Sequence, residues 1–223
     1  MISAIMAAIG AAMIVLAIVA ARCRDTAPVA SGLTVVVSLG LAYDNVVVAI
    51  GPLIDYGDVL SAINVPRFWL HVFTLPLLII VGGLLVARLG VGWLTTRAAI
   101  VVDSVMVASL VVIGVIGELT PLDLVESDAG GATRYVNDAM YGPPIPAIVT
   151  IIVLIGLGAL AWRAAGWPWL LVGALVMFAA AAVPGVLWIS NAGELVLQTT
   201  IVATLVSVTH WARAEMSLIG VEV

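Results

Sequence analysis

Apolar residues fill seven long stretches of this chain, and each stretch is bounded by arginine, proline, glycine or acidic residues. A helix needs about 20 such residues to cross the ~30 Å hydrocarbon core of a bilayer. We therefore expect an all-α fold, a seven-transmembrane-helix bundle that forms one domain over residues 1–223. The predicted helices cover about 2–21, 31–54, 66–87, 97–117, 144–162, 168–189 and 193–212.

One long polar segment, about 118–143, interrupts this pattern between the fourth and fifth predicted helices. It combines acidic residues with Arg134 and the pair Gly130-Gly131. This composition is typical of a solvated loop, and its length leaves room for a short hairpin.

From the composition we expect the lipid bilayer to be the partner of this chain. Apolar residues make up 64% of the sequence and charged residues 9%, and the mean hydropathy is +1.27. These values exclude a soluble globular domain, a disordered chain and a nucleic-acid-binding protein. An acidic balance of −5 without lysine suits a salt-loving organism, although a GC-rich genome explains the missing lysine equally well.

The positions of the arginines predict the orientation. Basic residues near helix ends are retained on the cytoplasmic side. Six of the eight arginines follow the first, third, fifth and seventh predicted helices or precede the fourth; the exceptions are Arg67 and Arg134. We expect a multi-pass protein of the cell (plasma) membrane with its N-terminus and the acidic loop outside and its C-terminus in the cytoplasm.

Asp44 is the deepest ionisable residue in the predicted helices, and it lies between Tyr43 and Asn45. Ionisable groups inside a membrane are costly, so each one is a candidate functional group. Asp44 would accept a proton, bind an ion or anchor a bound molecule. Alternatively, it makes a structural hydrogen bond to a neighbouring helix.

Two polar stripes start at the predicted external end. Arg67, His71 and Thr74 share a face of the third helix, and Asn191, Glu194 and Gln198 are spaced similarly on the seventh. Facing each other, the stripes would form a buried network in which Arg67 pairs with Glu194. The alternative is a collar whose charged ends reach the lipid headgroups.

The sequence holds no convincing catalytic constellation. With two histidines near opposite ends of the bilayer, His71 and His210, we expect neither a shared haem nor a metal site. Tyr43-Asp44 is similar to half of an intramembrane aspartyl protease site, but Ala159 stands where the second aspartate belongs. We therefore expect no enzyme and no metal.

The third predicted helix resembles that of the microbial rhodopsins, the bacteriorhodopsin-type opsins. That helix typically reads Arg-Tyr-x-Asp-Trp-x-x-Thr-Thr-Pro-Leu, and Arg67, Phe68, Thr74, Pro76 and Leu77 fit it in register. A weaker similarity surrounds Pro184 in the sixth helix. The resemblance implies seven helices, an external N-terminus and kinks at both prolines.

The departures from the family concern the chromophore site. The family binds retinal through a lysine of the seventh helix, and this chain has no lysine, so a retinal Schiff base is excluded. Leu70 replaces the counter-ion aspartate, and His71 replaces the tryptophan beside the chromophore. Smaller residues in the sixth helix, Ala180 and Val183, would leave a cavity for another apolar ligand unless neighbouring side chains fill it.

These observations favour an opsin-like membrane protein without photochemistry. It would act as a sensor, receptor or accessory subunit that binds an apolar or lipid-like ligand noncovalently, in a cavity among the second, third, sixth and seventh helices lined by Asp44 and Thr74. The alternative is a passive proton or ion pathway through Asp44, His71, Arg67 and Glu194. An enzyme acting on lipid and a purely structural protein are further alternatives. Small residues around Gly10 make a homo-oligomer, a dimer or trimer, plausible.

Overall fold

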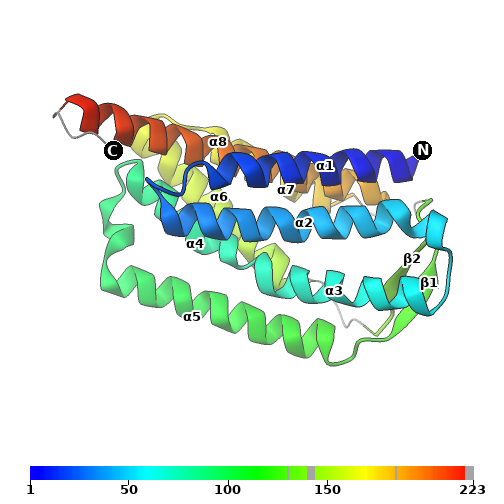
Figure 1. Ribbon diagram of the computed structural model, residues 1–223. Helices are drawn as coiled ribbons and strands as arrows, with labels where there is room; N and C mark the ends of the chain where they lie inside the picture. The colour runs from blue at the N-terminus through cyan, green and yellow to red at the C-terminus, as the bar shows by residue number, and fades with distance from the viewer. Residues whose placement is uncertain (130, 140–143, 184, 219–223) are drawn as a thin grey trace.

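The chain folds into a bundle of long α-helices with one small β-hairpin (Figure 1). A computed structural model describes residues 1–129, 131–139, 144–183 and 185–218, with side chains as far as residue 214. The helices are α1 (Ile2–Ala21), α2 (Pro28–Ile54), α3 (Asp58–Thr74), α4 (Leu77–Arg88), α5 (Arg97–Gly114), α6 (Ile145–Ala165), α7 (Trp169–Ala181) and α8 (Leu187–Leu218). Two short helical turns, η1 (Gly92–Thr95) and η2 (Val115–Leu119), flank α5.

Most of these helices suit a bilayer. Among the described residues, six helical segments are long and apolar enough to cross a membrane, with α3 and α4 taken together as Asp58–Arg88. This fits a multi-pass membrane protein. The remaining helix, α7, has 13 residues, which corresponds to about 20 Å of helix. It lies between α6 and α8, and the N-terminus and the last described turn of α8 lie at opposite ends of the bundle (Figure 1).

The interior is built from aliphatic side chains and small residues. One large buried cluster joins α1, α2, α4, α6, α7 and α8 and includes the fully buried Met13, Val37, Leu85, Leu154 and Leu205. Gly10, the centre of the small-residue face on α1, packs inside this chain against Val46 of α2. That glycine therefore serves packing within the chain, while Ala7, Ala8 and Ala11 remain exposed.

The third predicted helix is interrupted at Pro76, as the sequence predicted. α3 ends at Thr74 and α4 begins at Leu77, because proline has no N–H to donate and its ring collides with the preceding turn. The second predicted kink, at Pro184, lies outside the described residues.

Three of the predicted helices had wrong boundaries. α3 begins at Asp58 instead of residue 66, since the chain reverses tightly at Asp55 and Gly57, where φ is 65° and 143°. The sixth predicted helix ends at Ala181 instead of residue 189, shortly before Gly185 with its φ of 76°. The last helix is longer than predicted, Leu187–Leu218 instead of 193–212.

The polar segment between α5 and α6 contains the short hairpin for which the sequence left room. Strands β1 (Leu124–Ser127) and β2 (Arg134–Asn137) pair antiparallel, and they cover the end of the bundle where the N-terminus lies (Figure 1). The hairpin approaches α2 closely at Gly51. A Cβ atom there would lie 1.9 Å from the carbonyl oxygen of Thr133, so only glycine allows this contact.

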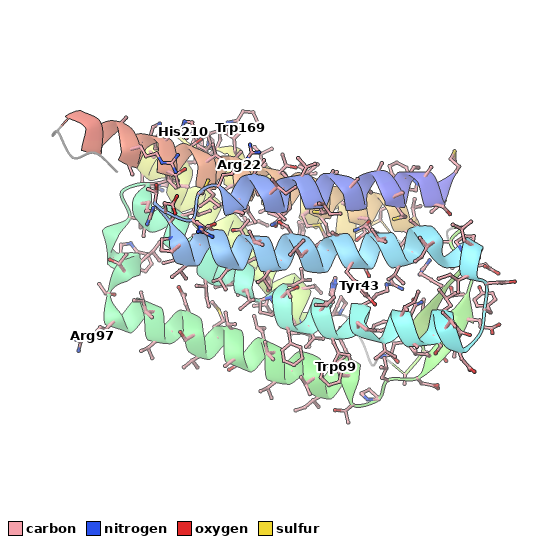
Figure 2. All side chains as sticks on the ribbon, in the orientation of Figure 1. Arg22, Tyr43, Trp69, Arg97, Trp169 and His210 are labelled. Atoms are coloured by element: carbon pink, nitrogen blue, oxygen red, sulfur yellow. The ribbon has the colours of Figure 1, made fainter. Side chains whose placement is uncertain are left out.

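Arginines gather at the end of the bundle opposite the hairpin. Arg22 and Arg97 lie there together with His210 (Figure 2). Two more of them tie the helix ends together, because Arg88 donates to the carbonyl of Thr26 and Arg213 donates to its hydroxyl. The arginines from which we predicted the orientation therefore lie together at one end of the folded bundle.

Candidate functional site

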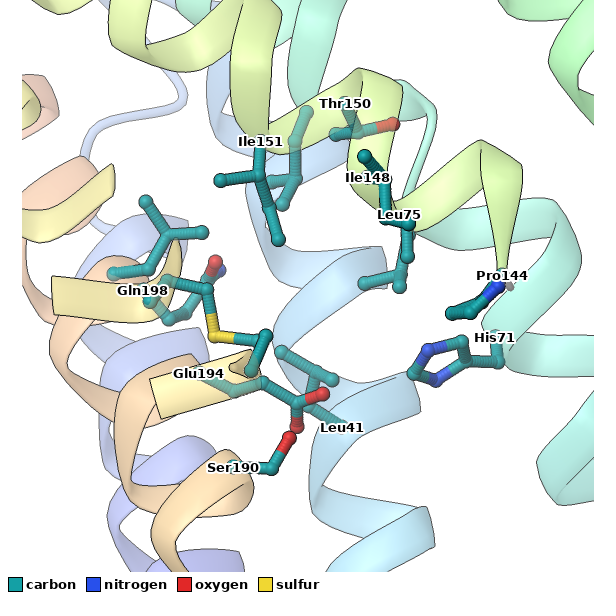
Figure 3. A pocket seen from close by; sticks show the side chains of 15 residues that line it. Leu41, His71, Leu75, Pro144, Ile148, Thr150, Ile151, Ser190, Glu194 and Gln198 are labelled. Atoms are coloured by element: carbon teal, nitrogen blue, oxygen red, sulfur yellow. The ribbon is translucent and has the colours of Figure 1, made fainter. Parts of the chain in front are cut away.

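A cavity of about 240 Å³ lies between α2, α3, α4, α6, α7 and α8 (Figure 3). Its wall is mainly aliphatic, with Leu, Ile, Ala and Pro side chains and Met177. The predicted cavity among the second, third, sixth and seventh helices is thus present, and α6 contributes a further wall. A second recess, beside the hairpin, shares Ser190 with it, so the cavity approaches the surface on that side.

Asp44 and Thr74, which we expected to line this cavity, do not. Their places are taken by Leu41, one helical turn before Asp44, and by Leu75. The hydroxyl of Thr74 donates to the carbonyl of Leu70, and its side chain packs against Gly40 of α2. Of the neighbours Thr74 and Leu75, only Leu75 therefore reaches the cavity, and on α2 the cavity wall ends one turn before Asp44.

Three polar side chains gather at one end of the cavity. Glu194 and Ser190 reach it from α8, and His71 reaches it from α3 on the opposite side (Figure 3). The carboxyl of Glu194 and the ring of His71 point toward one another across the space. Within the described part of the chain, neither side chain makes a hydrogen bond or an ion pair. Both groups are therefore available to a bound molecule.

Two further polar side chains lie deeper in the wall. Gln198 and Thr150 are 1% and 2% exposed, and both line the cavity. The amide nitrogen of Gln198 donates to the hydroxyl of Ser38 and to the carbonyl of Thr34, at 2.7 and 3.3 Å. The amide oxygen of Gln198 and the hydroxyl of Thr150 have no partner among the described residues. Buried polar atoms without a partner are rare in folded proteins and call for an explanation.

The predicted ion pair between Arg67 and Glu194 was wrong. Arg67 binds Asp44 instead, with 2.7 Å between Nε and the carboxylate oxygen, and the two side chains are 10% and 20% exposed. Asp44 is therefore a paired carboxylate rather than an isolated one. The cause is the early start of α3: Asp44 lies ten residues before α2 ends, and Arg67 lies nine residues after α3 begins. In an antiparallel helix pair these positions are opposite.

Arg67 also connects the helices to the hairpin. Its Nη1 donates to Asn64 Oδ1, which accepts the backbone N–H of Tyr135 as well. Tyr135 is buried, and its carbonyl lies 3.5 Å from the same Arg67 nitrogen. Arg134 precedes Tyr135 in β2, and burial and the nearby charge of Arg67 lower the pKa of Arg134. The Arg67 cluster, comprising Asp44, Asn64, Arg67 and Tyr135, thus fastens the hairpin to the bundle.

Three further polar residues that the sequence singled out, Tyr43, Asn45 and Asn191, donate to backbone carbonyls. Tyr43 donates its hydroxyl to the carbonyl of Ile63 on α3 at 2.9 Å, and Figure 2 places it between the two helices. Asn45 and Asn191 each donate to a carbonyl one turn earlier in their own helices. The cavity receives His71, Glu194 and Gln198, but not the other five predicted site residues, Tyr43, Asp44, Asn45, Arg67 and Thr74.

Sequence reasoning missed three residues that line the cavity, Thr150, Ser190 and Met177. Ser190 stands four residues before Glu194, so helical spacing would have found it once α8 was known to begin at Leu187. Thr150 is a lone hydroxyl in an apolar helix, a pattern that usually means a bond to the helix backbone. No three metal-ligating side chains come together in the described ranges.

Comparison of the chain with models of known protein families, with curated proteins and with solved structures finds no match.

Proposed function

We propose that this protein binds an apolar or lipid-like molecule noncovalently, in the cavity between α3, α6, α7 and α8, and acts as a membrane sensor, receptor or accessory subunit. One observation carries the proposal: a cavity of about 240 Å³ has an aliphatic wall and a few polar groups that have no partner within the described chain. Ligand sites are typically concave and mostly apolar, with a few convergent polar groups.

The proposed scaffold has seven spans, with α7 as the shortest, and its N-terminus outside the plasma membrane. The opposite positions of the N-terminus and the last described turn of α8 support an odd number of passes, and the arginine-rich end supports a cytoplasmic C-terminus. The hairpin would then face the outside. The opsin resemblance around Arg67 and Pro76 remains a prediction from sequence, as does self-association through α1.

A passive proton or ion pathway receives less support from the geometry. It would use Asp44, Arg67, His71 and Glu194 in one connected route. Asp44 and Arg67 instead bind each other beneath the hairpin, and they do not line the cavity that His71 and Glu194 share. Proton flux into proteoliposomes that is lost in Asp44→Asn would restore this alternative.

The test is extraction in a mild detergent, followed by an absorption spectrum and mass spectrometry of the organic extract. We expect a stoichiometric apolar molecule with the natural protein. The variant Ala147→Phe should lose it, because Ala147 lines the cavity and a phenyl ring would fill much of the space. Ala108→Phe is the matched control, since Ala108 lies on the exposed surface of α5.

Two results would contradict the proposal. One is an extract that contains only bulk membrane lipids in the same ratio for all three proteins. The other is a specific molecule that Ala147→Phe retains as fully as Ala108→Phe, because it would then be bound elsewhere.

A further inference from the structure

Glu194 is the one acidic residue among the described residues that line the cavity, and none of them is an arginine. Asp44 and Arg67, whose charges also act on Glu194, bind each other, so their effects on it oppose one another. Within the described chain, Glu194 therefore has no counter-ion. A carboxylate removed from bulk water is costly unless a cation pairs with it. The cavity thus favours a ligand that brings a positive charge.

The neighbours of Glu194 can accept hydrogen bonds from such a ligand. Ser190 stands four residues earlier on α8, so the two side chains share a face of the helix, and both line the cavity. His71 extends toward Glu194 from α3, on the opposite wall (Figure 3). A hydroxyl oxygen and an unprotonated imidazole nitrogen can both accept, and a carboxylate accepts only. This end of the cavity therefore suits a cation with N–H donors.

The composition of the wall selects among cations. The described lining residues include no phenylalanine, tyrosine or tryptophan. Quaternary ammonium groups, which have no N–H, are typically bound by such aromatic side chains. In an amino-phospholipid the phosphate lies between the ammonium group and the hydrocarbon chains, so it would enter the aliphatic part of the cavity without a cationic partner. A simple primary or secondary amine meets neither obstacle.

The order of polar and apolar groups in the cavity matches that of an amphiphile in a bilayer. Glu194 lies seven residues after α8 begins, roughly 10 Å along the helix. Ser190 also belongs to the recess beside the hairpin, so the polar end of the cavity is the one that approaches the surface. The aliphatic wall continues from there toward Ile148 and Ile151 (Figure 3). A charged amphiphile likewise keeps its head near the membrane surface and its hydrocarbon chain in the core.

We propose that the ligand is a lipophilic primary or secondary amine. Its ammonium group donates to the carboxylate of Glu194, and its hydrocarbon part fills the aliphatic space. The inference rests on the proposed function and names the chemical class of the ligand. The volume of about 240 Å³ exceeds the ~150 Å³ of an engineered apolar cavity that binds benzene, so a chain of several carbons fits.

The experiment uses the full chain in phosphatidylcholine nanodiscs, labelled by light with a diazirine-bearing octane, which is uncharged. Mass spectrometry locates the adducts, and we expect them on peptides that line the cavity, such as those with Ile148, Ile151 or Met177. Decylamine, which is charged at pH 7 as a lysine side chain is, should displace this label best. The competitors, compared at equal mole fraction in the membrane, are 1-decanol, decanoate and decyltrimethylammonium.

The variant Glu194→Gln keeps the shape of the side chain and removes its charge. The octane probe should still label the cavity, but about 10- to 100-fold more decylamine should be needed to displace it, the value of one hydrogen bond to a charged group. Glu126→Gln is the matched control, because Glu126 is exposed on β1 of the hairpin and does not line the cavity. It removes an equal charge from the surface and should leave the competition by decylamine unchanged.

The outcomes separate the two proposals. If any of the three competitors displaces the label as well as decylamine does, the amine inference is overturned, while labelling of the cavity still supports an apolar ligand site. The inference also fails if Glu194→Gln leaves the competition by decylamine unchanged, or if Glu126→Gln weakens it as much. The competitor series is measured on the natural protein, so it does not depend on the folding of a variant. If the octane probe leaves the cavity peptides unlabelled, both the inference and the proposed function fail.

Discussion

Helix α3 contributes Arg67 to the Arg67 cluster and, one turn later, His71 to the cavity. The two regions differ in whether their buried polar atoms have partners. In the cluster, the charged groups have partners: Arg67 donates to Asp44 and to Asn64, and Asn64 also accepts the backbone N–H of Tyr135. In the cavity, Gln198 and Thr150 keep unpaired polar atoms. A buried charge that loses its partner destabilises a fold strongly, whereas a buried polar atom that has no partner in the chain is a place where another molecule can bind.

Breaking the ion pair between Asp44 and Arg67 should lower the free energy of unfolding most, because removing one partner leaves the other charge buried. We expect Asp44→Ala to lower the free energy of unfolding by about 3 kcal/mol, measured by denaturant unfolding in detergent. The control is Asp25→Ala, since Asp25 and Arg24 form a pair that is 70% and 79% exposed and should contribute less than about 0.5 kcal/mol. Equal losses in the two variants would contradict the structural role of Asp44.

Removing the contact between Asn64 and the hairpin should cause the next largest loss of stability. Asn64→Leu removes the acceptor of both Arg67 Nη1 and the Tyr135 N–H, at a cost of about 2 kcal/mol. Hydrogen exchange at Tyr135 should accelerate about 30-fold, because the hairpin then opens more often. Asn191→Leu on α8 serves as control, as its amide donates within its own helix. An unchanged exchange rate in Asn64→Leu would show that other contacts hold the hairpin.

Substitution of Thr150 in the cavity wall should change the free energy of unfolding least, and it should raise this energy instead of lowering it. Thr150→Val removes a buried hydroxyl that has no partner in the described chain, so the delipidated protein should become more stable by about 1 kcal/mol. Thr204→Val is the paired counterpart, because Thr204 accepts the indole N–H of Trp167 at 2.9 Å, and we expect a loss of about 1 kcal/mol. Thermal unfolding of both variants measures the difference. A loss in Thr150→Val would mean that its hydroxyl is satisfied.

Hydrophobic pattern alone predicted most of the helices, because a bilayer demands about 20 apolar residues for each crossing. α1, α2, α5 and α6 lie close to the predicted ranges. The failures have local causes. Pro66 was interpreted as the start of a helix, although it lies inside α3, and the apolar residues before Gly185 concealed the early end of α7.

The candidate site was predictable only in part. Rarity singled out Asp44, Arg67, His71 and Glu194, since charged and polar groups seldom occur in apolar helices. The ion pair between Asp44 and Arg67 depends on the short turn between α2 and α3. The predicted helix start at residue 66 made this turn too long, so the pair was not predicted. The packing of six helices decides which polar groups remain unpaired. The spacing of residues along one helix does not predict this packing.

By itself, the sequence determined that the chain belongs in a membrane, that one end of the bundle is rich in arginine, and that no lysine exists to bind retinal. These properties follow from residue type and order alone. The tertiary structure decided that Asp44 pairs with Arg67 and that Gln198 and Thr150 face an open space. The reason is geometric: the contacts of a side chain depend on helix rotation and on the helices packed against it, and both arise only when the bundle assembles.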